Sequence, residues 1–417
     1  MLLEFWIALL GADRIDLLGG RGPAVLLPVH LLTALIVIRE WTRRARARSI
    51  PRLDARGATF AALLLGALAL VALSVLRSAD IATSTGRAVL FAATALAVPV
   101  ALLGMSDRAD LRQILGRGGV LGLAIALLFS GLQVMAFFGL LPFVLEVGPA
   151  RVLLEPFIYE TVPRLAGASA DMNRGALMAL CHTTFVVIGT PPGRARQFWI
   201  AVGAVLIVGS LSRSVGLAAV VALVVNAPAM YARLRHARTA RGAAVGTAAL
   251  LGAVAVVSAL LLAPTVREST GRVLAPLSQR FELTEGSAQA HTYLLRRGLE
   301  VASQDVPTTL IGIGFGSAFR ALADDFEGGR YGNFHSTWIT FWAESGVFAL
   351  LIVIALFVGP LPRAGPLAGL LLGLMVYNTF YNGHLEPVLW LTFALAWLAP
   401  AALRSDAVVK PRPRVPA

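Results

Sequence analysis

The recurrence of long apolar segments at short intervals constrains this 417-residue chain more than any other feature. A helix needs about 20 mostly apolar residues to cross the hydrocarbon core of a bilayer, and segments of that kind follow one another along the sequence. Charged residues make up only 14% of the chain, against about a quarter in soluble proteins. The pattern excludes a large soluble core and predicts an all-α polytopic membrane protein.

We expect about twelve transmembrane helices, each near the length that a bilayer requires. The predicted spans cover residues 2–18, 23–42, 59–76, 88–105, 118–139, 175–190, 197–211, 214–231, 243–264, 336–358, 366–381 and 387–403. The first span is the weakest, because Asp13, Arg14 and Asp16 interrupt its apolar run. We therefore expect it to be short or interfacial.

The arginines set the predicted orientation. Of the 36 basic residues, 21 fall in alternate loops and the C-terminal tail, which hold roughly 70 residues, and 15 fall in roughly 140 residues on the other side. Basic residues gather on the cytoplasmic side, so an even number of spans predicts cytoplasmic N- and C-termini. The net charge of +13 lies in loops between spans, and it therefore indicates topology and not a nucleic-acid partner.

This topology predicts four regions. They are residues 1–264 with nine spans and an outer-face segment at about 140–174, a large outer loop at 265–335, three spans in 336–403, and a basic cytoplasmic tail at 404–417. Loops of such length are usually functional or disordered. The large loop contains AQAHTYLLRRGLEVASQ, whose apolar pattern predicts a helix, followed by a proline and GIGFG. We therefore expect an ordered, partly helical loop, with a tight turn at the glycines.

Several arginines are expected on the outer face. Residues 197–231 are too long for one span, so the chain must break near Ser210–Ser214 and leave Arg213 at the membrane boundary. Arg174 begins the sixth span on the same face, and Arg296 and Arg297 lie in the predicted loop helix. Together they suit a phosphate or diphosphate, because one guanidinium group can donate two parallel hydrogen bonds to the oxygens of a phosphate. The alternative for each is a solvated or headgroup-contacting arginine.

His335 closes the large loop just before a predicted span. An imidazole is a suitable general base near neutral pH, and the alternative is an interfacial polar cap. Glu344 lies nine residues further on, on the opposite side of a regular helix, so it is expected to fix a neighbouring polar group and not His335. His384, in the last short outer loop, is placed to approach the same cavity. No metal-ligand spacing is present, and no metal or cofactor is expected.

Four segments, in this order, resemble the O-antigen ligase and polymerase superfamily of bacterial membrane enzymes that transfer lipid-linked glycans. They are DMNRGALMAL, SLSRSVGLAAV, LLRRGLEVASQDVPTTLIGIGFGSAF and FHSTWITFWAESGVFALLIV. The close resemblance covers about Asp171 to Val358, and the span count with one large outer loop also fits. One position departs from the family pattern: Ser336 follows His335 where members often have Asn. A serine there can still donate a hydrogen bond.

The resemblance implies a glycosyltransferase of the bacterial inner membrane with its active site on the periplasmic face. Its donor would be a glycan on undecaprenyl diphosphate. Arg213, Arg174 and one or both of Arg296 and Arg297 would hold the diphosphate, and His335 would deprotonate the attacking sugar hydroxyl.

Two reactions remain open within the family. One is polymerisation of repeat units, and the other is ligation of a finished glycan to a lipid A core or another acceptor. A transporter is the alternative of a different class. The sequence shows neither the internal symmetry nor the midplane polar residues that a transporter would carry.

Overall fold

The computed structural model describes residues 1–17, 28–49, 51, 53–106, 108–159, 162–236, 286–323, 325, 332–399 and 403. The predicted span at 243–264, the first part of the large outer loop and the predicted basic tail lie outside these residues. Among the described residues helices predominate, with five short strands between Ile15 and Arg164.

The helices of the first half are α1 (Leu2–Ala8), α2 (Pro28–Arg46), α3 (Ala55–Val75), α4 (Ile81–Gly104), α5 (Leu111–Phe137), α6 (Met172–Gly189), α7 (Arg194–Gly209) and α8 (Arg213–His236). Those of the second half are α12 (Gly286–Ala302), α13 (Val306–Ile311), α14 (Ala318–Ala321), α15 (Thr337–Ser345), α16 (Val347–Val358), α17 (Ala368–Phe380) and α18 (Pro387–Leu398). Short 3-10 turns, η3 (Leu361–Arg363) and η4 (Gly365–Leu367), link α16 to α17.

Three of these helices, α3, α4 and α5, are long and apolar enough to cross a membrane. Four shorter apolar stretches accompany them, at Arg213–Ala227, Val347–Arg363, Gly365–Phe380 and Pro387–Leu398. The apolar helices agree with the expected membrane protein, while the count of twelve spans stays a prediction.

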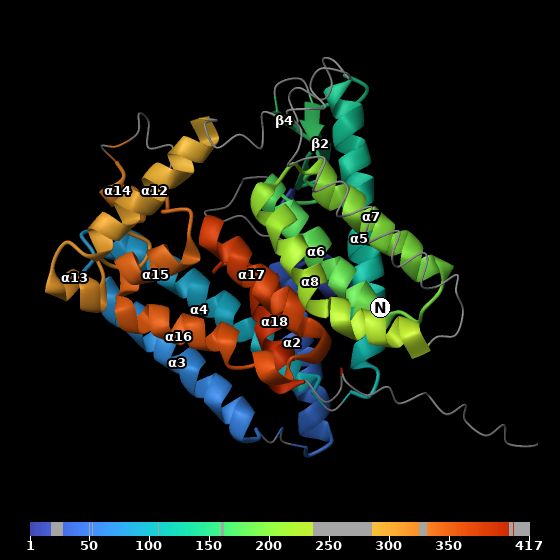
Figure 1. Cartoon of the computed structure of the whole chain (residues 1–417), viewed down its shortest axis with the longest axis horizontal. Coiled ribbons are helices and arrows are strands. Elements are labelled where there is room, and N and C mark those ends of the chain that lie inside the picture. Colours follow the sequence, from blue (N-terminus) through green and yellow to red (C-terminus); the bar gives the residue numbers. More distant parts are fainter. Residues whose placement is uncertain are drawn as a thin grey trace, which may run out of the picture.

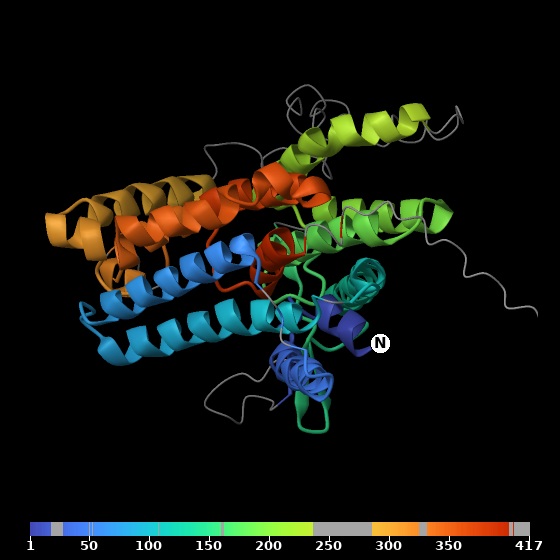
Figure 2. The ribbon, with the colours of Figure 1, turned by 90° about the horizontal axis from the view of Figure 1, so that it is seen from below.

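Helices α17 and α18 lie in the middle of the molecule (Figure 1). On one side α18 packs against α4, and α16 packs against α3. On the other side α17 packs along α8, which follows α6 and α7 in the group that also contains α5. Helix α12 runs beside α15 in both views (Figures 1 and 2). The described part of the predicted large loop, from Gly286 on, therefore packs against the apolar helices.

The predicted span 336–358 differs from the structure, because it is broken at Gly346 into α15 and α16. Gly346 has φ 86°, and a Cβ at this position would lie 2.0 Å from the carbonyl oxygen of Leu310. Only glycine accommodates both the left-handed backbone and so close an approach. The break admits the end of α13 and the glycine turn that follows it.

The weak first span is short in the structure, since α1 ends at Ala8. The Arg14 side chain, which is buried, donates to the carbonyl oxygens of Ser169 (2.5 Å), Leu153 (3.1 Å) and Glu155 (2.7 Å). This arginine ties the N-terminal segment to the outer-face segment.

The segment at about 140–174, predicted to lie on the outer face, forms strands that the sequence did not predict. Strands β1 (Ile15–Asp16), β3 (Ala150–Leu153) and β2 (Val144–Val147) make an antiparallel sheet in that order. Strands β4 (Phe157–Tyr159) and β5 (Val162–Arg164) form a separate antiparallel pair. The sheet joins the N-terminus to the segment that leads into α6.

Candidate active site

The start of α6 carries a partly buried ionic cluster. The side chain of Asp171 caps the helix by accepting from the backbone N–H of Arg174 (2.9 Å). The guanidinium of Arg174 then donates to Glu386 (2.6 Å) and to Asp13. Arg174, predicted to hold a diphosphate, is therefore bound to two carboxylates from opposite ends of the chain.

The predicted break between two spans occurs at Ser210–Ser212, between α7 and α8. Leu211 has φ 55°, a left-handed conformation that costs a branched residue strain. Arg164 of β5 stabilises this turn by donating to the carbonyl oxygens of Ser210 (2.8 Å) and Leu211 (3.3 Å). The sequence analysis did not single out Arg164, because nothing in the sequence pairs it with a turn about 46 residues away.

The same turn connects Arg213 to the start of α6. The hydroxyl of Ser212 donates to the side-chain oxygen of Asn173 (2.8 Å), and Arg213 is the first residue of α8. Arg213 is half-buried. Arg174 and Arg213, predicted separately to lie on one face, thus flank the Asn173–Ser212 hydrogen bond.

His335 sits on a strained turn immediately before α15. Its φ is 51°, and its backbone N–H donates to the side chain of Asn333 (2.8 Å), which holds the turn. Ser336 is the N-cap of α15: its hydroxyl oxygen accepts from the N–H of Ile339 and its hydroxyl donates to the carbonyl oxygen of Asn378 (3.4 Å). Ser336, at the position where the family often has Asn, therefore caps α15. Its two hydrogen bonds fix the backbone directly after His335.

Two aromatic rings from distant elements contact His335. The imidazole of His291, on α12, lies 4.5 Å from it between centroids and at 82°. The ring of Tyr381, at the end of α17, lies 6.2 Å away. The Tyr381 hydroxyl lies beside the Asp171 carboxylate, which connects His335 to the start of α6. Burial lowers the pKa of His335 to about 4, so the imidazole is neutral at pH 7 and can accept a proton.

Neither His291 nor Tyr381 was singled out from the sequence. Both are ordinary residues of predicted helical segments, and their role is visible only when α12 and α17 meet at His335. The one available signal for His291 was its place within the same outer loop as His335.

Arg296 and Arg297, also on α12, are bound to carboxylates of the loop. Arg296 pairs with Glu300 (3.0 Å) and is 81% exposed, while Arg297 pairs with Asp325 (3.1 Å) and Glu300 (3.5 Å). The structure brings a different residue of this helix, His291, into contact with His335.

Glu344 lies at the end of α15 and holds the glycine turn. Its two carboxylate oxygens accept from the backbone N–H groups of Gly316 and Ala318, each at 2.8 Å. The carboxylate is buried, so these bonds fix the loop onto the membrane helices. Glu344 thus acts on backbone groups of the outer loop.

His384 lies in the loop between α17 and α18, where it is buried. One ring nitrogen is 2.5 Å from the side-chain oxygen of Asn382, and the ring packs 5.4 Å from both Phe315 and Phe341. Burial lowers its pKa to about 3. This environment indicates a neutral histidine that braces the loop.

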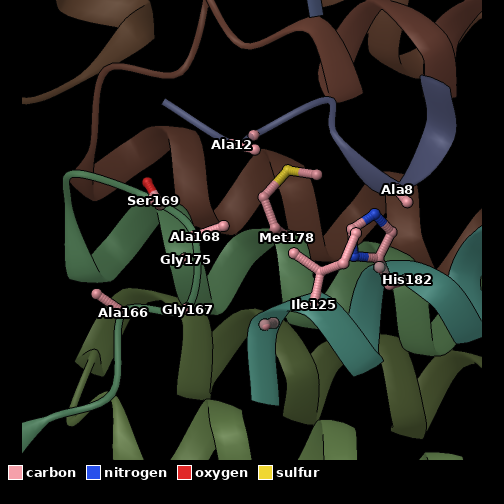
Figure 3. A pocket seen from close by; sticks show the side chains of 13 residues that line it. Ala8, Ala12, Ile125, Ala166, Gly167, Ala168, Ser169, Gly175, Met178 and His182 are labelled. Carbon is pink, nitrogen blue, oxygen red and sulfur yellow. The ribbon is translucent and has the colours of Figure 1, made fainter. Parts of the chain in front are cut away.

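Two of the hollows in the described part of the chain lie near these elements. A void of about 20 Å³ lies between α1, α5 and α6, where Met178 and His182 project from α6 (Figure 3). It has room for about one water molecule and none for a sugar. An open groove of about 330 Å³ between α8, α15 and α17 is mostly apolar. Its lining residues are Val221, Trp338, Leu372, Met375, Val376 and Thr379.

Comparison with known proteins connects this arrangement to a family. The sequence model of the family described as O-antigen ligase matches residues 198–354. The match spans the Ser212–Arg213 turn, α12, the glycine turn, His335 and Glu344. A search of the curated proteins finds no match to the chain. The matched segment supports the resemblance of this chain to the O-antigen ligase and polymerase superfamily.

Proposed function

We propose that this protein polymerises cell-surface polysaccharide by transferring a glycan from undecaprenyl diphosphate to a second lipid-linked repeat unit. The observation that carries the proposal is the bridge that Tyr381 makes between His335 and the start of α6. Tyr381 contacts the His335 ring on one side and lies beside Asp171 on the other. Arg174 lies three residues after Asp171 on α6. Asn173 accepts a hydrogen bond from Ser212, which is the last residue of the turn and the neighbour of Arg213.

In the proposed reaction the acceptor hydroxyl attacks the anomeric carbon of the donor sugar. The bond from that carbon to the diphosphate oxygen breaks, and its electron pair leaves with the lipid diphosphate. Arg213 neutralises the charge that develops there, a contribution of about 10²- to 10³-fold in comparable sites. His335 accepts the hydroxyl proton, which is worth about 10²- to 10⁴-fold for a positioned base. The arginines do the electrostatic work, so the proposal calls for no metal or cofactor.

The diphosphate site is assigned to Arg213 and Arg174. Binding to Arg174 would require the diphosphate to displace Asp13 or Glu386 from the guanidinium. Arg296 and Arg297 would have to leave Glu300 and Asp325 in the same way. A doubly charged diphosphate competes well with carboxylates for these guanidinium groups, because each guanidinium can donate two parallel hydrogen bonds to phosphate oxygens.

The apolar groove suits the lipid part of the donor. Trp338, which contributes to it, lies in the first turn of α15, just after His335 and Ser336. We assign the prenyl chain to this groove, with the diphosphate at its outer end. We further propose that the active site faces the periplasm of the inner membrane, with both chain termini in the cytoplasm.

A ligase is the second candidate, favoured by the description of the matched family. It would pass the same donor glycan to a lipid A core or another acceptor. The donor chemistry at Arg213 and His335 would be shared, and only the acceptor would differ.

The test uses purified protein in detergent with a lipid-diphosphate-linked repeat unit as the only substrate. A ladder of longer lipid-linked chains, lost in His335→Ala and Arg213→Ala, is the expected result. Arg151→Ala is the matched arginine control, since its side chain is 47% exposed on the outer sheet and pairs with Glu146. His30→Ala, at an exposed position of α2, is the matched histidine control.

Transfer that appears only when a lipid A core or another acceptor is added would replace polymerase with ligase. Absence of transfer to every acceptor, with folded protein and a donor confirmed intact, would overturn the proposal.

A further inference from the structure

The contact between His291 and His335 is the feature that the proposed reaction leaves unused. The two imidazoles come from different elements, α12 and the turn before α15, about 44 residues apart in the sequence. Their rings are 4.5 Å apart and nearly perpendicular. An edge of one ring therefore faces the other, so a ring nitrogen or carbon of one approaches the second imidazole.

The sequence of α12 directs His291 to this position. His291, Leu294 and Gly298 are spaced by three and four residues, so they share one face of the helix. Leu294 is fully buried in a cluster that includes Phe334, the neighbour of His335. His291 continues the same face by about one turn, which brings its ring to His335.

Gly298 permits the close approach of α12 to α15. A Cβ at this position would lie 2.4 Å from the Ile339 side chain and 2.8 Å from the Phe334 ring. Any larger residue would push the two elements apart. The position of His291 against His335 is thus fixed by packing two turns further along the helix.

The two sides of His335 differ chemically. On one side the His335 ring contacts Tyr381, whose hydroxyl lies beside the Asp171 carboxylate at the start of α6. On the other side His291 is only half-buried and lies on a loop helix whose next residues, Thr292 and Tyr293, are exposed. A proton on His335 therefore has an imidazole between itself and the outer solution.

We propose that His291 is a positioning residue that orients the His335 imidazole toward the acceptor hydroxyl and passes on the proton that His335 receives. This inference rests on the proposed function. In each turnover the acceptor O–H bond breaks, its proton goes to a nitrogen of His335, and the new glycosidic bond forms as the diphosphate leaves. The proton then moves through His291 to periplasmic water, and His335 returns to its neutral form.

The test measures initial transfer rates of the full-length protein with the lipid-diphosphate-linked repeat unit, in a weak buffer at fixed pH and ionic strength. The variants are His291→Ala and His291→Gln. Glutamine can hold a hydrogen bond but cannot carry the proton, and it preserves a polar side chain if alanine loosens the helix. Leu299→Ala, at an exposed position of α12, is the control for helix docking. Each variant is also assayed with increasing imidazole.

We expect kcat to fall about 10-fold or more in both His291 variants, within the range of a proton-transfer group, with KM for the donor unchanged. Added imidazole should restore the rate of His291→Ala and leave wild type and Leu299→Ala unaffected. A structural role alone would not respond to imidazole. In a His335→Ala background, removing His291 should cost nothing further, because His291 acts through His335.

An increase in KM without a change in kcat would make His291 a donor contact and overturn the inference. So would normal rates in both His291 variants, or a loss that imidazole does not repair. These results would leave the proposed function intact, provided wild type transfers and His335→Ala does not. Failure of wild type itself to transfer would instead count against the proposed function.

Discussion

Removal of the Glu344 carboxylate should detach the glycine turn from the membrane helices. The carboxylate accepts two hydrogen bonds at 2.8 Å, from Gly316 and Ala318, in a site that excludes water. Leaving one buried N–H without its acceptor costs about 1–3 kcal/mol. Glu344→Ala leaves two, so it should lower the free energy of unfolding by about 2–6 kcal/mol, with the larger values if the turn cannot relax.

A graded series sharpens the expectation. Glu344→Gln keeps one acceptor oxygen and turns an amide NH₂ group toward the other N–H, so its cost should be about half as large, near 1–3 kcal/mol. Ser345→Ala is the adjacent control, since it removes only a 3.3 Å contact between its hydroxyl and that of Ser74. It should cost about 0.5–1.5 kcal/mol.

The assay is thermal and denaturant unfolding in detergent, followed by tryptophan fluorescence, because Trp338 and Trp342 lie on α15 itself. Transfer activity is measured on the same samples. Ala318 and Phe334 share one buried cluster, so release of the turn should also disturb the residue next to His335 and reduce the rate. Equal stability of Glu344→Ala and Ser345→Ala would refute the reasoning.

Three further outcomes follow from the packing and charges. Gly298→Ala should move α12 away from Phe334 and slow transfer, with little loss of overall stability. The transfer rate and the melting temperature of the same sample test this expectation. A wild-type rate would contradict the close approach of α12 to Phe334. Arg174→Ala leaves the buried Glu386 carboxylate unpaired and should destabilise the protein by about 3–5 kcal/mol, whereas adding Glu386→Gln should recover much of that loss. Burial lowers the pKa of His384 to about 3 in the folded protein. As the pH falls, the unfolded chain therefore binds a proton at His384 before the folded protein does. The free energy of unfolding should be highest above about pH 6.5 and fall as the pH drops toward 3. His384→Phe should flatten that decline in melting temperature, and an unchanged decline would exclude His384 as its source.

Local signals in the sequence were enough for several elements. The 35-residue apolar window at 197–231 could not be a single span, and the structure ends α7 at Gly209 and begins α8 at Arg213. The apolar pattern of AQAHTYLLRRGLEVASQ predicted a helix, and α12 covers this segment as far as Ala302. Such features depend on periodicity and length alone, which a single sequence contains.

The remainder depended on contacts between distant segments. Hydropathy made 336–358 look continuous, because nothing in the apolar run shows that Leu310 of another element lies against Gly346. The strands of the outer-face segment are held partly by Arg14 from the N-terminus. Arg174 was predicted from its position as a cation on the outer face, yet its two carboxylate partners lie 161 and 212 residues away. Pairings at such separations leave no local trace in the sequence.

The ionic cluster at Arg174 also has a consequence for biosynthesis. Asp13 is made before Arg174, and Glu386 follows it by 212 residues. At about 5–20 residues per second, a nascent chain would wait about 10 to 40 seconds between the insertion of α6 and the arrival of Glu386. Throughout that interval Asp13 can neutralise the guanidinium at the membrane boundary. The Asp13 side chain thus serves as the counter-ion of Arg174 during insertion. The ionic cluster becomes complete only when α17 and α18 dock and bring Glu386 to the arginine.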